Sequence, residues 1–169
     1  MIPHSSATSG GLTWLKVSSR NFELNRNGQV IGRLQRPSYW SRTFEAETQG
    51  GRWTFRRAGC LGGRSEIRDS HSGQQIADFK SAWGSRGGSL TFADGQIFHL
   101  QCNGWWRPVW SVTANTGELL VRLHRREKTV ELPQAKGVPE SHTALLVLFT
   151  WYQIMQSEED AAMAVIAAG

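Results

Sequence analysis

The fold is decided by the stretch Ala144-Leu-Leu-Val-Leu-Phe-Thr-Trp-Tyr-Gln-Ile-Met155, close to the C-terminal end of the sequence. Wound into an α-helix, it carries apolar side chains on every face, because only Thr150 and Gln153 are clearly polar. Such a helix has to be surrounded, either by protein or by lipid. The stretch has about 12 residues, whereas a bilayer span needs roughly 20 mostly apolar ones. We therefore predict a helix that is enclosed by protein and covers about residues 141–157.

The chain before this stretch has the pattern of β-hairpins. Glycine suits tight hairpin turns because they require positive φ. Apolar and polar residues alternate with a period of two on either side of each turn, as in half-buried strands. Five hairpins give ten strands, and residues 12–19 and 128–132 add two, so we expect about twelve antiparallel strands. The turn glycines, spaced by 22, 23, 22 and 22 residues, are Gly28, Gly50, Gly73, Gly95 and Gly117.

The expected strands and the expected helix fit one another geometrically. An eight-stranded barrel is filled by its own side chains, and the diameter grows with strand number, so about twelve strands leave an axial space. A helix roughly 10 Å across can fill that space, and closure also removes exposed strand edges. We predict a mainly β fold, a closed antiparallel barrel of about twelve strands that encloses the C-terminal hydrophobic helix. The alternative is a β-trefoil, which also has about twelve strands.

Length and composition favour one domain, since 169 residues with 39% hydrophobic content can form a substantial core. We expect a flexible N-terminus over residues 1–11 and the barrel over residues 12–157. An acidic and alanine-rich tail over residues 158–169 either extends the helix or frays. The N-terminus lacks the features of a secretion signal, and Cys60 and Cys102 make neither a disulfide framework nor a zinc motif. A cytoplasmic location is therefore expected.

These features resemble the tubby C-terminal-like fold, which includes the LURP-one-related proteins and the phospholipid scramblases. The likeness covers Leu12 to Gln156 and is carried by the glycine-turned hairpins and the helix from Leu145 to Met155. It implies a twelve-stranded barrel threaded by its helix. For tubby proteins it implies phosphoinositide binding through basic side chains on the barrel wall, and for scramblases a connection with membranes and calcium. The chain departs from scramblases in having no palmitoylated cysteine cluster and no D-x-[DN]-x-[DN]-G calcium loop.

The charge of the chain favours anionic partners, since 19 Lys and Arg stand against 14 Asp and Glu, a net charge of +5. On one expected strand, Leu119, Val121 and Leu123 face the core and leave a basic row on the outer face. Each cation near an anionic membrane contributes about 1 kcal/mol, although the same row would also serve as a solvated outer face. The candidate anionic-ligand site comprises Arg122, His124, Arg125, Arg126 and Lys128, with Arg52 and Arg56 added if the barrel brings them near.

Tryptophans occur in three of the four connectors between hairpins, as Trp40, Trp83 and the pair Trp105-Trp106. We expect these aromatic side chains to close the mouth of the barrel. The alternative is a role at a membrane interface or in stacking on a ligand.

The sequence contains no hydrolase, nucleotide-binding or metalloprotease motif, so it predicts no catalytic residue, cofactor or metal site. The favoured function is a non-enzymatic binding or scaffold protein. Its partner would be an anionic phospholipid, such as a phosphoinositide, or another protein, which allows a peripheral position at a membrane. One alternative is a nucleic-acid-binding protein, although a recognised stacking motif is missing. Another is an enzyme with a pocket at a barrel mouth, because sites assembled across strands leave no linear motif.

Overall fold

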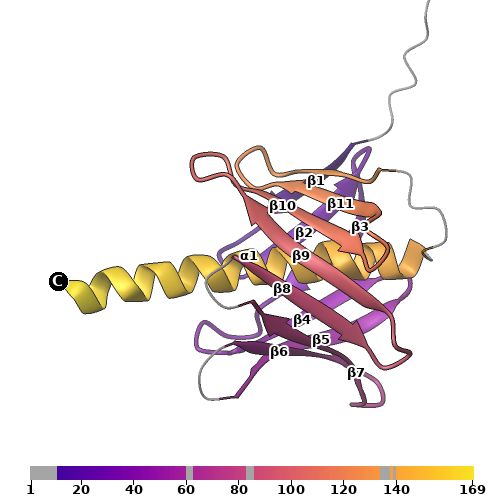
Figure 1. The fold of residues 1–169 in the computed structure, drawn as a ribbon, viewed down its shortest axis with the longest axis horizontal. Coiled ribbons are helices and arrows are strands. Elements are labelled where there is room, and N and C mark those ends of the chain that lie inside the picture. Colours follow the sequence, from indigo (N-terminus) through magenta and orange to yellow (C-terminus); the bar gives the residue numbers. More distant parts are fainter. Residues whose placement is uncertain (1–10, 60–62, 83–85, 134–137, 139) are drawn as a thin grey trace, which may run out of the picture.

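Twelve strands form one closed antiparallel barrel, and a long helix, α1 (Glu140–Ala168), runs along its axis (Figure 1). The structure is a computed structural model that describes residues 11–59, 63–82, 86–133, 138 and 140–169. Sequence neighbours pair throughout, and β1 pairs with β12 to close the barrel. The predicted fold class is confirmed, and the trefoil alternative is not needed. The strands are β1 Leu12–Lys16, β2 Asn21–Arg26, β3 Gln29–Gln35, β4 Thr43–Thr48, β5 Gly51–Ala58, β6 Arg64–Asp69, β7 Gln75–Ser81, β8 Gly87–Phe92, β9 Ile97–Asn103, β10 Val109–Ala114, β11 Leu119–His124 and β12 Thr129–Glu131.

The hairpin turns fall where the glycine spacing predicted them. Asn27 and Gly28 both have positive φ, 52° and 80°, which is the combination of a type I′ turn. At the second turn the positive φ belongs to Gly51 and not to Gly50. β1 and β12 are shorter than the predicted segments, because Val17 and Lys128 lie in the connectors that follow and precede these strands.

α1 fills the space inside the barrel, as the all-round apolar pattern predicted. Every side chain from Leu145 to Tyr152 is buried, and the Thr150 hydroxyl donates to the backbone carbonyl of Leu146 at 2.7 Å. Gly32 of β3 lets the wall approach the helix, since a Cβ there would lie 3.3 Å from Cδ2 of Leu148. Most of the apolar surface of the helix is thereby removed from water, which is the main stabilising contribution to this fold.

Aromatic rings join the helix to opposite walls of the barrel. Phe149 meets Phe55 of β5 and Phe79 of β7, with ring centroids 5.3 and 5.5 Å apart. Trp151 stacks on Trp14 of β1 at 4.8 Å. Five strands separate β1 from β7 in either direction around the barrel. The helix therefore reaches from wall to wall, and its large side chains fix the diameter that the strands enclose.

The helix is longer than predicted, because it continues through the expected tail to Ala168. Alanine has the highest helix propensity, and residues 161–168 contain five alanines. These eight residues are exposed and project beyond the barrel by about 12 Å, at 1.5 Å per residue (Figure 1). Of the two outcomes expected for residues 158–169, extension of the helix is the one observed.

Removing a central ring should test the enclosure of the helix. Phe149→Ala is expected to lower the free energy of unfolding by about 3–5 kcal/mol, because it leaves a cavity at a fully buried position. Urea denaturation followed by circular dichroism measures this value. Met163→Ala, on the projecting part, is the control and should change stability by less than about 0.5 kcal/mol. Equal effects of the two substitutions would contradict the enclosure.

Tyr152 should make stability depend on alkaline pH. Burial raises the pKa of the Tyr152 phenol to about 12. The nearby Ser65 hydroxyl offsets part of this rise, although the two oxygens do not have the geometry of a hydrogen bond. The stabilisation from a neutral phenol is complete below the unfolded-state pKa of about 10. It is lost between about pH 10 and 12, by roughly 2–3 kcal/mol.

Tyr152→Phe should remove this loss, because its ring cannot ionise. The difference in unfolding free energy between wild type and variant, measured at several pH values, isolates the contribution of Tyr152 from that of other groups. A constant difference from pH 9 to 12 would contradict burial of the phenol.

Candidate functional site

The barrel has two chemically different ends. Because consecutive strands are antiparallel neighbours, connectors after odd-numbered strands lie at one end and those after even-numbered strands lie at the other. We name the first the exit end, since α1 leaves the barrel there, and the second the turn end (Figure 1). Among the described residues, the exit end comprises residues 17–20, 36–42, 59, 63, 82, 86, 104–108 and 125–128, and the turn end comprises residues 27–28, 49–50, 70–74, 93–96, 115–118, 132–133 and 138.

Positive charge is concentrated at the exit end. The turn-end residues that the structure describes include two acids, Asp94 and Glu118, and neither Lys nor Arg. The exit-end connectors hold one acid, Glu127, and eight cationic residues. Connector charge is thus sorted along the barrel axis, which net charge alone does not reveal. The exit-end cations are Arg20, Arg36, Arg42, Arg86, Arg107, Arg125, Arg126 and Lys128.

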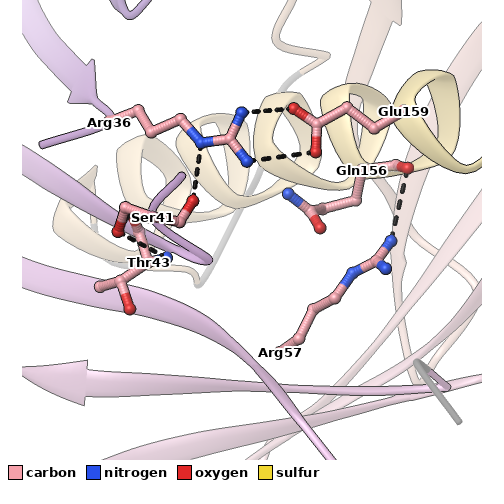
Figure 2. A network of polar contacts seen from close by, with 6 residues as sticks. All are labelled: Arg36, Ser41, Thr43, Arg57, Gln156 and Glu159. Carbon is pink, nitrogen blue, oxygen red and sulfur yellow. Dashed lines mark hydrogen bonds and ion pairs between the residues drawn. The ribbon is translucent and has the colours of Figure 1, made fainter. Parts of the chain in front are cut away.

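Three ion pairs hold the helix where it leaves the barrel. Glu158 accepts two hydrogen bonds from Arg125, at 2.6 and 2.9 Å. Glu159 forms a bidentate pair with Arg36, at 2.6 and 3.3 Å (Figure 2). Asp160 accepts from Arg57 of β5 at 2.6 Å. We call these six residues the collar.

The collar follows from helix geometry. Successive helical residues point about 100° apart, so three consecutive acids face three different parts of the rim. Arg57 also donates to the backbone carbonyl of Gln156 at 3.4 Å, and Arg36 to that of Ser41 at 2.7 Å (Figure 2). Arg125 lies over the ring of Trp151, with its guanidinium carbon 5.1 Å from the centroid. The collar fixes the direction in which the helix emerges and neutralises its three acids.

Most residues of the predicted anionic-ligand site are paired with carboxylates on the barrel wall or in the collar. Arg122 and His124 both contact Glu131, at 3.4 and 3.0 Å, and Arg125 belongs to the collar. Arg126 and Lys128 are exposed, and neither contacts a carboxylate in the part of the chain that the structure describes. The basic row on β11 is therefore largely neutralised, while its continuation into the connector is not.

Arg52 and Arg56 do not join this row. They lie on β5, which five strands separate from β11 in either direction, so the barrel does not bring them near the row and the condition for enlarging the patch is not met. Arg52 pairs with Glu47 at 2.8 Å, and Arg56 pairs with Glu66 at 3.0 Å. Burial alone would raise the pKa of Glu66, but its hydrogen bonds with Arg56 and Arg68 lower it. Both arginines therefore form ion pairs with carboxylates of the neighbouring strands on the barrel wall.

The set of β11 side chains that point into the core also differs from the prediction. Val121 and Leu123 are buried as expected, but Leu119 is only partly buried. A register shift opposite Val112 and Thr113 brings Leu120 into the core as well. A bulge places two consecutive side chains on one face, which strict alternation cannot predict.

Exposed aromatic residues surround the exit of the helix. Trp40, Trp105 and Trp106 are 88%, 82% and 87% exposed, so they do not close the barrel mouth as predicted, and Trp83 lies outside the described residues. Tyr39 packs edge-on against Trp40, and Arg86 lies over Trp105. All large apolar side chains that are exposed in the described ranges lie at the exit end, near the end of β1 that leads into it, or on the helix beyond it: Leu15 on β1, then Val17, Tyr39, Trp40, Trp105, Trp106, Met163, Val165 and Ile166.

Three cavities in the described part of the chain are lined in part by the helix, and the one beside Phe92, His142 and Leu145 has a volume of about 350 Å³. Another of about 440 Å³ at the turn end is lined by Leu24, Arg26 and Val147, among others. A more polar one of about 190 Å³ lies at the exit end beside Arg57 and Arg86. An enzymatic site at a barrel mouth, the alternative drawn from the sequence, stays a prediction. Among the described residues, no group of three His, Cys, Asp or Glu is arranged to hold a metal ion.

Comparisons of the chain with protein-family models, curated proteins and solved structures give no match. The resemblance to the tubby-like fold thus stays a prediction. In the described ranges, no helix has both the length and the apolar content needed to cross a bilayer.

The collar should show energetic coupling between barrel and helix. In a double-mutant cycle with Arg36→Ala and Glu159→Ala, we expect about 1 kcal/mol of coupling in unfolding free energy. The pair is bidentate, and the Arg36 side chain is only 16% exposed. Urea denaturation provides the four values. The matched control is the wall pair Arg33–Glu23, with Arg33 61% exposed, where coupling should be below about 0.5 kcal/mol. Additive effects at Arg36 and Glu159 would show that the collar does not hold the helix.

Proposed function

We propose that this protein is a non-enzymatic binding protein that docks on anionic membrane surfaces through the exit end of its barrel. The observation that carries the proposal is the coincidence of unneutralised cations and exposed aromatic side chains at the exit end, which the described residues of the turn end do not share. Lipid headgroups that carry phosphate are the chemistry this combination fits. The resemblance to tubby-like proteins, for which lipid binding is implied, points in the same direction.

The cations supply the attraction. Six exit-end cations have no carboxylate partner among the described residues, and all six are exposed. Each contributes about 1 kcal/mol near an anionic leaflet, an interaction that salt weakens within a Debye length. Together they support reversible and salt-sensitive docking. They are Arg20, Arg42, Arg86, Arg107, Arg126 and Lys128.

The aromatic residues supply a second, non-electrostatic contribution. Trp and Tyr are enriched at membrane–water interfaces, where an apolar ring meets a polar edge. The side chains of Trp40, Trp105 and Trp106 are exposed to water and do not stabilise the barrel. Docking of the exit end would place these rings at the level of the lipid headgroups. The barrel axis would then stand perpendicular to the membrane plane. Because the wall residues of the predicted site are paired with carboxylates, we propose the end of the barrel, and not its wall, as the binding surface.

Charge reversal should test the proposal. The exit variant, Arg42→Glu with Arg107→Glu and Arg126→Glu, changes three connectors of the exit end. The wall variant, Arg33→Glu with Arg52→Glu and Arg122→Glu, makes the same change in net charge on the barrel wall. In flotation with vesicles containing phosphatidylserine or a phosphoinositide, the exit variant should lose at least tenfold in affinity. The wall variant should lose less than threefold, and vesicles of phosphatidylcholine alone should bind the wild type weakly.

Two results would overturn the proposal. Equal losses in the two variants would show that only net charge matters. Tight binding to a single-stranded oligonucleotide without binding to anionic vesicles would favour the nucleic-acid alternative, in which the tryptophans stack on bases.

A further inference from the structure

The projecting end of α1 is apolar on all sides. Residues 161–168 read Ala-Ala-Met-Ala-Val-Ile-Ala-Ala and contain no polar side chain. Met163, Val165 and Ile166 are 66%, 74% and 73% exposed. Inside the barrel, the apolar side chains of α1 are covered by twelve strands. No described residue covers the apolar side chains of residues 161–168. An exposed apolar surface of this kind marks an interaction site.

The projection stands at the centre of the docking surface proposed above. It leaves the barrel through the collar, with the exit-end connectors around it (Figure 1). The three acids that precede it are already paired with arginines, so their carboxylates do not repel an anionic lipid surface. The arrangement of side chains at this end matches a membrane interface. Cations suit the headgroups, aromatic rings suit the boundary below them, and the apolar helix end suits the acyl chains.

We infer that residues 161–168 of α1 insert into the facing leaflet of an anionic bilayer when the exit end docks. We call these eight residues the peg. The inference rests on the proposed function and specifies how the surface engages lipid. The projection is about 12 Å long, and the headgroup layer of one leaflet is roughly 5–7 Å thick. The peg therefore passes the headgroups and brings Val165 and Ile166 to the start of the acyl chains, far short of crossing the bilayer.

A lipid fits the peg better than a second copy of the chain does. At about 100° per residue, Met163 and Ile166 share one face of the helix and Val165 lies beside it, while alanines occupy the rest of the circumference, so the projection has no polar side. Helix pairing needs a single apolar stripe, while a surrounding medium accepts apolar groups on every side. Two copies that met through this end would also bring two cationic exit ends together, which their like charges oppose.

The test is an uncharged change of the peg. The peg variant, Met163→Gln with Val165→Gln and Ile166→Gln, retains good helix propensity and alters only exposed positions. Its affinity for phosphatidylserine vesicles should fall on the order of a hundredfold, because it removes three large apolar groups from contact with lipid. The control variant, Ala161→Gln with Ala162→Gln, changes the base of the projection at headgroup level and should lose less than threefold. Urea denaturation should give the same unfolding midpoint for all three proteins.

Salt dependence separates the peg from the electrostatic surface. The affinity of the wild type for anionic vesicles should fall between about 0.1 and 0.5 M salt, because salt screens roughly six cations. The peg variant should show the same fall, whereas the exit variant should show a smaller one. If the peg variant binds like the wild type while the exit variant does not, the peg is wrong and the proposed function stands. If neither variant is impaired, both are wrong. A wild-type dimer in sedimentation that becomes monomeric in the peg variant would assign the projection to a second copy and overturn insertion.

Discussion

The structure depends on the burial of one helix that is apolar on every face. Residues 145–152 of α1 are all buried, and their rings meet walls that lie on opposite sides of the barrel. Twelve strands without this helix would enclose a void too wide for their own side chains to fill. The helix without the barrel would expose its whole apolar surface to water. Each element therefore stabilises the other, and neither has an independent core.

The threading of the helix also gives the barrel its polarity. A helix that starts after the last, even-numbered strand has to leave among the connectors of the odd-numbered strands. Those connectors carry eight Lys and Arg residues, and the collar turns two of their arginines, together with Arg57 of β5, toward the helix acids. The remaining cations, the exposed tryptophans and the apolar end of α1 share one face as a result. The proposed docking surface is thus a consequence of topology together with connector composition.

The sequence predicted the fold because its signals are local and periodic. Alternation with a period of two, regularly spaced turn glycines and an all-round apolar helix each report on neighbouring residues. The site was harder to predict, since it depends on which connectors share an end and which cations already have partners. Arg122 and His124 looked available on β11, but Glu131 lies on the paired strand β12. Arg20, Arg42, Arg86 and Arg107 were missed, although sorting connectors by strand parity would have grouped them.

Hydrogen exchange of the α1 backbone amides tests the central claim most directly, since it reports local opening along the helix. Amides of residues 145–154 should exchange only through global unfolding and be among the slowest in the chain. Amides of residues 162–168 should exchange many-fold faster in the absence of vesicles. Fast exchange of residues 145–154 under conditions where the strands remain protected would contradict a barrel built around an enclosed helix.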